Sequence, residues 1–208
     1  MKQFIIKSSK LFLAFFLFIF IAACSDDDDN DSSNPFSSGN TFSMKIDGSH
    51  WVSNISTLDT EMIDDIPGEE YYYVYIGGTI VEEVDALPIE TMAIYLGIPE
   101  SRFNNPMGSY SLTDNISTEL NHASAIYVSS RNDIYKTYIV TEQSTGSVEV
   151  TGFEIGEQTF MGQSTGEIGY TKLSGKFNLE LIAPDDPSDK IIITDGQFNF
   201  TSNLDFGF

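Results

Sequence analysis

From residue 42 onward, apolar and polar residues alternate with a period of two in short segments, as they do in half-buried β-strands. The first such segment, 42–46, is followed by Asp47 and Gly48, a dipeptide that readily takes the positive φ angles of a tight hairpin turn. The return limb covers 50–52. The sequence therefore predicts a β-hairpin at the start of the folded part of the chain.

Further extended segments follow, separated by glycine, proline, asparagine and aspartate residues that favour turns. They cover residues 71–81, 89–98, 108–112, 123–129, 135–141, 146–155, 172–182, 191–194 and 198–200. Inside the first of them, Gly77 and Gly78 indicate a bulge or a bend. Asp195 and Gly196 separate the last two segments.

No segment beyond residue 40 keeps the 3.6-residue apolar period of a helix, and we expect at most one helical turn, around 117–122. We therefore predict an all-β fold for residues 41–208, a single antiparallel β-sandwich or β-barrel of about nine to ten strands. Periodicity does not report strand register, so the sequence leaves the choice between sandwich and barrel open.

The chain begins with a segment of a different kind, in which three lysines precede thirteen apolar residues, 11–23, and then Cys24. Positive, apolar and small residues in this order predict a secretory signal peptide, here residues 1–23. The apolar run is too short to cross about 30 Å of hydrocarbon as a stable helix.

The residues that precede the cysteine, Ile21, Ala22 and Ala23, resemble the lipobox of bacterial lipoproteins. This resemblance implies that the Cys24 sulfur receives a diacylglycerol before cleavage and that the new amino terminus is then acylated. Several acyl chains matter because a single chain, at about 0.8 kcal/mol per buried methylene, binds a membrane only marginally. The alternative is an ordinary signal peptide with an unmodified cysteine near its end.

An acidic run follows Cys24 directly, and it resembles the surface-export signal of lipoproteins from Bacteroidota. The run consists of Ser25, Asp26, Asp27, Asp28 and Asp29. The resemblance implies transport to the outer leaflet of the outer membrane, facing the medium. The other interpretations are a solvated spacer and a calcium loop, which would lack the glycine of an EF-hand. Residues 24–40 are expected to form a lipidated cysteine and a flexible acidic tether.

The charge of the chain excludes some partners. It has 31 acidic and 10 basic residues, and loss of the three leader lysines would leave seven basic residues and a net charge of −24. Such a surface repels nucleic acid and anionic lipid, so we expect no nucleic-acid partner and membrane contact only through the lipid on Cys24. Because Cys24 is the only cysteine, no disulfide can form within the chain.

Five short segments of the folded part resemble an uncharacterised family of small Bacteroidota lipoproteins. They are residues 44–51, 108–110, 146–150, 174–178 and 193–198. The resemblance covers most of residues 42–200. It implies the fold and the location of the protein, but no activity and no functional residues.

Few side chains suggest catalysis. His50 and His122 share no motif, and each is expected to be a surface residue close to a strand. No local signature of a Ser-His-Asp triad is present. Zinc is disfavoured because its sites use several cysteines or histidines, and no cofactor is predicted. Paired carboxylates could hydrolyse a glycoside, but a chain with 31 acidic residues brings carboxylates together by chance.

Three carboxylates between two predicted strands form a candidate calcium site: Asp185, Asp186 and Asp189. Calcium accepts carboxylate and carbonyl oxygens in variable geometry. The simpler interpretation is an exposed turn, because Pro184 and Pro187 stand among the aspartates.

Tyrosines form a candidate ligand-binding stripe. Tyr71, Tyr73 and Tyr75 alternate along one predicted strand and therefore share one face of it. If that face points outward, the rings could stack on a sugar or on a partner protein. The simpler interpretation is packing between neighbouring strands, and either face of the strand could be the core.

These observations favour a surface-exposed lipoprotein of the outer membrane, not an enzyme, whose β-domain is a binding or interaction module. Its ligand is unknown; a glycan or an envelope protein is expected from the location. Two alternatives stay open. A calycin-like carrier of a small apolar ligand would need a cavity lined by residues such as Tyr127, Phe153 and Phe177. A glycan-active hydrolase would need two carboxylates in one pocket.

Overall fold

The computed structural model describes residues 40–63, 70–83, 86–115, 120–131, 134–160 and 163–200. The predicted signal peptide, the lipidation site Cys24, the export signal Ser25 to Asp29 and all but the last residue of the tether lie outside these ranges. Of the helical turn expected around 117–122, residues 117–119 also lie outside these ranges, and His122 belongs to a strand.

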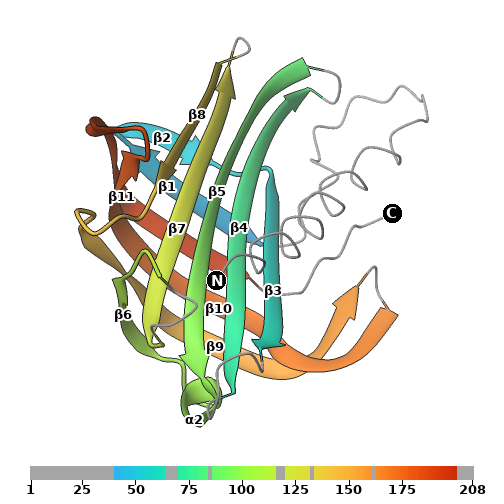
Figure 1. The fold of residues 1–208 in the computed structure, drawn as a ribbon. Helices are drawn as coiled ribbons and strands as arrows, with labels where there is room; N and C mark the ends of the chain where they lie inside the picture. The colour runs from blue at the N-terminus through green and yellow to red at the C-terminus, as the bar shows by residue number, and fades with distance from the viewer. Residues whose placement is uncertain are drawn as a thin grey trace, which may run out of the picture.

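The described residues form eleven strands and one helical turn (Figure 1). The strands are β1 (Thr41–Ile46), β2 (Ser49–Val52), β3 (Ile55–Ile63), β4 (Tyr71–Glu83), β5 (Ala86–Pro99), β6 (Gly108–Leu112), β7 (His122–Arg131), β8 (Ile134–Ile139), β9 (Gly146–Phe160), β10 (Gln163–Ala183) and β11 (Asp186–Phe200). The helical turn α2 (Glu100–Phe103) follows β5. The all-β prediction is confirmed.

One sheet folds over on itself and so makes two facing layers (Figure 1). Its strand order is β2-β1-β11-β10-β9-β6-β7-β5-β4-β3, and β8 pairs with both β7 and β10. Strands β1, β2, β9, β10 and β11 form one layer, and β3, β4, β5 and β7 form the other. Neighbours are antiparallel, except that β6 and β7 run parallel. The fold therefore combines the two facing layers of a sandwich with the continuous sheet of a barrel.

The two ends of the sheet are joined by a connection of only two residues, Ser53 and Asn54, between β2 and β3. The Ser53 amide donates to the Phe42 carbonyl in one layer, and the Asn54 amide donates to the Thr79 carbonyl in the other. The Asn54 side chain also exchanges two hydrogen bonds with the backbone of Val81. These bonds satisfy backbone groups that would otherwise be unpaired where the chain changes layers.

The predicted β1–β2 hairpin is confirmed, with residues paired from Ser43–Val52 to Ile46–Ser49. Its turn residues Asp47 and Gly48 have φ angles of 49° and 83°. Positive φ at both central positions is the requirement of a type I′ turn, whose twist matches that of the strands.

Both glycine-based strand predictions were wrong. At Gly77 and Gly78, β4 stays in register with β3 and β5, without a bulge. The lack of a side chain at Gly78 instead leaves room for the Phe42 ring of the facing layer, because a Cβ at Gly78 would lie 2.8 Å from Cδ1 of that ring. Asp195 and Gly196 do not end a strand either, because β11 continues through them past a register shift in its pairing with both neighbours. Asp195 takes a positive φ of 53° at this irregularity.

The sequence prediction missed β3. Its pattern is weak, since only Leu58 and Thr60 of its nine residues are buried. The two last predicted segments are one strand, β11.

Aromatic rings fill much of the space between the layers. The Phe42 ring lies 5.3 Å from that of Phe177 and 6.0 Å, edge to face, from that of Trp51. Phe177 in turn lies 6.4 Å from Phe198. Buried rings of this size contribute much of the apolar area that drives folding.

A buried carboxylate links the layers inside this core. Glu90 of β5 is only 5% exposed, and its Oε2 accepts hydrogen bonds of 2.8 Å from Trp51 Nε1 and from the Tyr127 hydroxyl. Trp51 lies on β2 in one layer, while Glu90 and Tyr127 lie on β5 and β7 in the other. Burial of a carboxylate is unfavourable unless hydrogen bonds compensate for lost hydration. These bonds therefore fix how the layers meet.

We predict that Glu90→Ala lowers the free energy of unfolding by about 2–5 kcal/mol, because it leaves the buried Trp51 and Tyr127 donors without this acceptor. Glu90→Gln should be milder, since its amide oxygen can still accept one of the bonds. Urea denaturation measures both. Glu149→Ala on the exposed side of β9 is the control and should stay within about 0.5 kcal/mol of the parent. An equally small effect of Glu90→Ala would contradict the proposed role.

Candidate functional site

The tyrosine-rich strand β4 turns one side toward the core and the other side away from it. Val74 and Ile76 belong to the core cluster, and Tyr72 packs against that cluster. The alternate residues Tyr73 and Tyr75 are half-buried on the opposite face. Tyr71 shares their face but is buried, with 5% of its surface exposed. The predicted stripe of three thus contributes two rings to the outer face.

A third ring on that face comes from β5. The register pairs Tyr75 with Tyr95, and the rings of these residues lie 5.5 Å apart. The Tyr73 ring lies 5.3 Å from the Tyr95 ring. Tyr73 itself is paired with Gly97, which has no side chain. We call Tyr73, Tyr75 and Tyr95 the tyrosine face.

The hydroxyls of the tyrosine face are available to a ligand. Within the described part of the chain, none of the three makes a hydrogen bond, whereas the hydroxyls of Tyr110 and Tyr170 in the core donate to backbone carbonyls. Burial raises the pKa of Tyr73 and of Tyr75 well above its ordinary value and raises the pKa of Tyr95 to about 12. All three phenols are therefore neutral donors at physiological pH.

Two carboxylates border the tyrosine face on β3. The register pairs Asp59 with Tyr75 and Glu61 with Tyr73, so their side chains share the outer face. Asp59 Oδ1 accepts a 2.8 Å hydrogen bond from the Thr60 amide. Desolvation raises the pKa of both carboxyls, and each is raised further by the negative charge of Glu167.

The β9–β10 hairpin brings Glu167 to this border. Its Gln158 side chain donates 2.8 Å to the Thr60 carbonyl of β3, and the Tyr170 amide donates 3.2 Å to the Thr60 hydroxyl. These bonds hold the hairpin against the outer edge of β3. Figure 1 shows the hairpin as the curved orange pair that extends below β3.

Sequence reasoning found Tyr73 and Tyr75 but missed Tyr95, Asp59 and Glu61. Tyr95 was within reach, because alternation along β5 separates it from the apolar Ile94 and Leu96. The carboxylates of Asp59 and Glu61 could not be predicted, because the sequence analysis missed β3.

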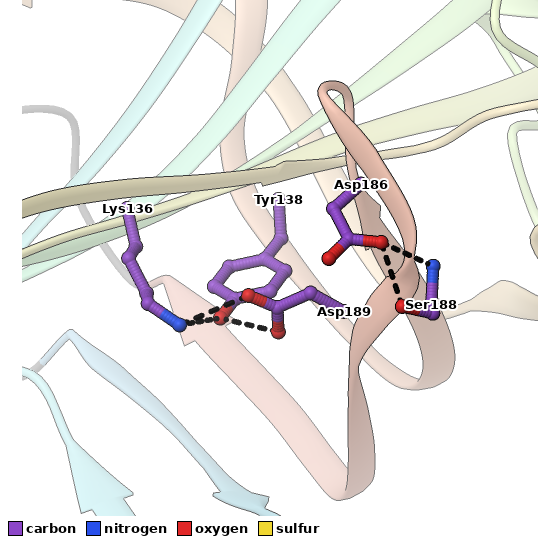
Figure 2. Close-up of polar contacts among 5 residues, drawn as sticks. All are labelled: Lys136, Tyr138, Asp186, Ser188 and Asp189. Carbon is purple, nitrogen blue, oxygen red and sulfur yellow. Dashed lines mark hydrogen bonds and ion pairs between the residues drawn. The ribbon is translucent and has the colours of Figure 1, made fainter.

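Two of the three candidate calcium residues, Asp186 and Asp189, are held by other contacts (Figure 2). Asp189 Oδ2 forms a 2.9 Å ion pair with Lys136, and its Oδ1 accepts a 3.1 Å hydrogen bond from the Tyr138 hydroxyl. Asp186 Oδ1 accepts from both the amide and the hydroxyl of Ser188, at 3.0 Å and 2.7 Å. Calcium would have to replace these partners. In the part of the chain that the structure describes, no three histidine, cysteine, aspartate or glutamate residues are grouped to hold a metal.

The two histidines lie apart. His50 is exposed on β2, beside a shallow depression of about 240 Å³ that includes the Lys45–Asp195 ion pair of 2.8 Å. His122 is half-buried at the start of β7, with Nδ1 2.9 Å from the Leu120 carbonyl oxygen.

The three residues expected to line a carrier cavity each contact a different side chain of the protein. The Tyr127 hydroxyl donates to Glu90, and the Phe177 ring packs on Phe42. Phe153 is partly buried, with its ring edge to face 6.3 Å from that of Tyr170.

Comparison of the chain with protein-family models, with curated proteins and with solved structures found no match. The resemblance to small Bacteroidota lipoproteins therefore stays a prediction. Among the described residues, no helix has the length and apolar character needed to cross a bilayer.

The carboxylates beside the tyrosine face yield a prediction about pH. A carboxyl whose pKa is raised on folding lowers stability at neutral pH, and this loss disappears as the pH falls through the raised pKa. Asp59→Asn keeps the oxygen that accepts from the Thr60 amide and removes the charge near Glu61 and Glu167. At pH 7 the variant should be more stable than the parent by about 0.2–1 kcal/mol, a range that allows for solvent screening. At pH 3 the variant and the parent should have the same free energy of unfolding.

The matched control is Asp186→Asn. Hydrogen bonds from Ser188 lower the pKa of Asp186, so its ionised form favours the fold and its neutralisation should not stabilise the protein at pH 7. Urea unfolding from pH 3 to pH 7 measures both variants. A destabilised Asp59→Asn at pH 7 would contradict the electrostatic interpretation.

Proposed function

We propose that this chain is a lipid-anchored protein of the outer membrane, exposed at the cell surface, whose β-domain is a binding module. In this proposal the lipid on Cys24 holds the domain at the membrane, and residues 25–40 separate it from the bilayer. The tyrosine face is the binding surface. Confinement to a surface raises the effective concentration of the domain for partners at that surface.

The observation that carries the binding role is the tyrosine face. Three neutral phenols without intramolecular hydrogen bonds, half-buried on the side of the sheet opposite the core, offer ring surface and polar atoms together. Tyrosine is common in binding surfaces because it combines an apolar body with a polar tip and has few rotatable bonds.

The contacts inside the fold favour an external site over a carrier cavity. The rings of Phe42, Trp51 and Phe177 lie close to one another, and Tyr127 is engaged by Glu90. A ligand inside would have to displace such contacts, whereas one on the outer face of β4 and β5 would not.

Anchoring and surface exposure are tested together. We expect the full chain to incorporate radiolabelled palmitate and to be digested when intact cells are treated with protease. Cys24→Ser removes the acceptor sulfur, so the variant should take up no label and should leave the detergent phase on partitioning.

The control is a chain with Asp26, Asp27, Asp28 and Asp29 replaced by asparagine. It should still be labelled, because Cys24 is intact, but it should be protected from protease outside the cell. A periplasmic protein reports that the outer membrane stays closed. Label on the Cys24→Ser variant would contradict lipidation at Cys24, and a protected parent chain would contradict surface exposure.

A further inference from the structure

The tyrosine face carries negative charge that the described part of the chain does not neutralise. Asp59 and Glu61 are exposed at its border, and Glu167 is close enough to raise the pKa of both carboxyls. The ion pairs among the described residues involve Lys45, Lys136, Lys172 and Lys190, and each of these lysines pairs with another acid. A positively charged ligand would supply the missing counter-charge.

The rings beside these acids suit the same kind of ligand. The faces of tyrosine rings attract ammonium and guanidinium groups within about 6 Å. A neutral sugar would also stack on the rings, but it would displace water from the carboxylates without a compensating positive charge. The combination of rings and unneutralised acids therefore favours a cation over a neutral glycan. The net charge of −24 expected for the processed chain would speed the approach of such a partner.

The spacing of the acids indicates how the cations would be arranged. Asp59 and Glu61 are two residues apart on β3, which places their Cα atoms about 6.7 Å apart along the strand. Side chains two positions apart in an extended peptide repeat at the same distance and on the same side. Tyr75 and Tyr73 continue the two rows onto β4. On β5, Tyr95 is paired with Tyr75, and its ring lies 5.5 Å from that of Tyr75 and 5.3 Å from that of Tyr73.

We propose that the tyrosine face docks an extended segment of a partner protein that carries lysine or arginine at alternate positions. One basic side chain lies beside Asp59 and Tyr75, and the next lies beside Glu61 and Tyr73. This inference rests on the proposed function, because it assigns a class of ligand to the same binding surface.

The test uses the full chain, purified in detergent, and short capped threonine peptides that contain two lysines and a fluorescent label. In one peptide a single threonine separates the lysines; in the other the lysines are adjacent, so that they point to opposite sides of an extended chain. Fluorescence anisotropy at low ionic strength should show saturable binding that is tighter for the alternating peptide. Asp59→Asn with Glu61→Gln should weaken it about tenfold or more. Tyr95→Leu, which keeps both acids, should weaken it about three- to tenfold.

The matched control is Glu142→Gln with Glu149→Gln, which removes two exposed acids from the turn before β9 and from β9 itself. Unchanged affinity in this control, with the losses above, supports the proposal. Equal losses in the two double variants overturn it, because net charge alone then explains binding. Equal affinity for the two peptides overturns the alternate spacing.

A neutral disaccharide separates this inference from the proposed function. Its effect is followed through the ring signals of fluorotyrosine incorporated into the full chain, with Tyr95→Leu to identify the face. If the ring signals shift with the disaccharide but not with the alternating peptide, the proposal of a cationic ligand is overturned, and the tyrosine face remains a binding surface. If the ring signals shift with neither, the cationic ligand and the binding role of the tyrosine face are both overturned.

Discussion

The Glu90 carboxylate holds the two layers of this protein in one arrangement. It is buried and accepts two hydrogen bonds of 2.8 Å, one from each layer: from Trp51 on β2 and from Tyr127 on β7. The hydrophobic effect is not directional, so apolar burial alone specifies the alignment of the layers less sharply. Hydrogen bonds to one buried carboxylate have a preferred geometry and so restrict that alignment. The short connection through Ser53 and Asn54 depends on the same alignment, since its amides bond to both layers.

Period-two alternation was enough to predict the fold class and the first hairpin, because a half-buried strand and a type I′ turn are local features. Contacts between residues of opposite layers could not be predicted from the sequence. Gly78 looks like a strand breaker until Phe42 is seen to occupy the space where its side chain would be. Glu90, between Ile89 and Thr91, likewise looks like an ordinary surface acid, and nothing local marks Trp51 and Tyr127 as its donors. The tyrosine face was predicted in part: alternation along β4 gave Tyr73 and Tyr75, whereas the register between β4 and β5 places Tyr95 beside them.

Two tyrosine hydroxyls in the core differ from those of the tyrosine face. The hydroxyls of Tyr110 on β6 and Tyr170 on β10 donate to backbone carbonyls. On the outer face, the phenols of Tyr73, Tyr75 and Tyr95 have no such partners. Because these three side chains are half-buried and not fully buried, their hydroxyls can donate to water or to a ligand. This difference supports the proposed binding role of the outer face of the sheet.

The contact of the β9–β10 hairpin with β3 has a consequence for crowded surfaces. β3 is the last strand of the sheet, and such an edge can pair with the same edge of a neighbouring molecule. Here Gln158 occupies the Thr60 carbonyl, and Tyr170 engages the Thr60 hydroxyl, so the middle of that edge is already covered. If the proposed lipid anchor confines the domain to a surface, copies of it collide in two dimensions. The covered edge then disfavours pairing between the sheets of two copies.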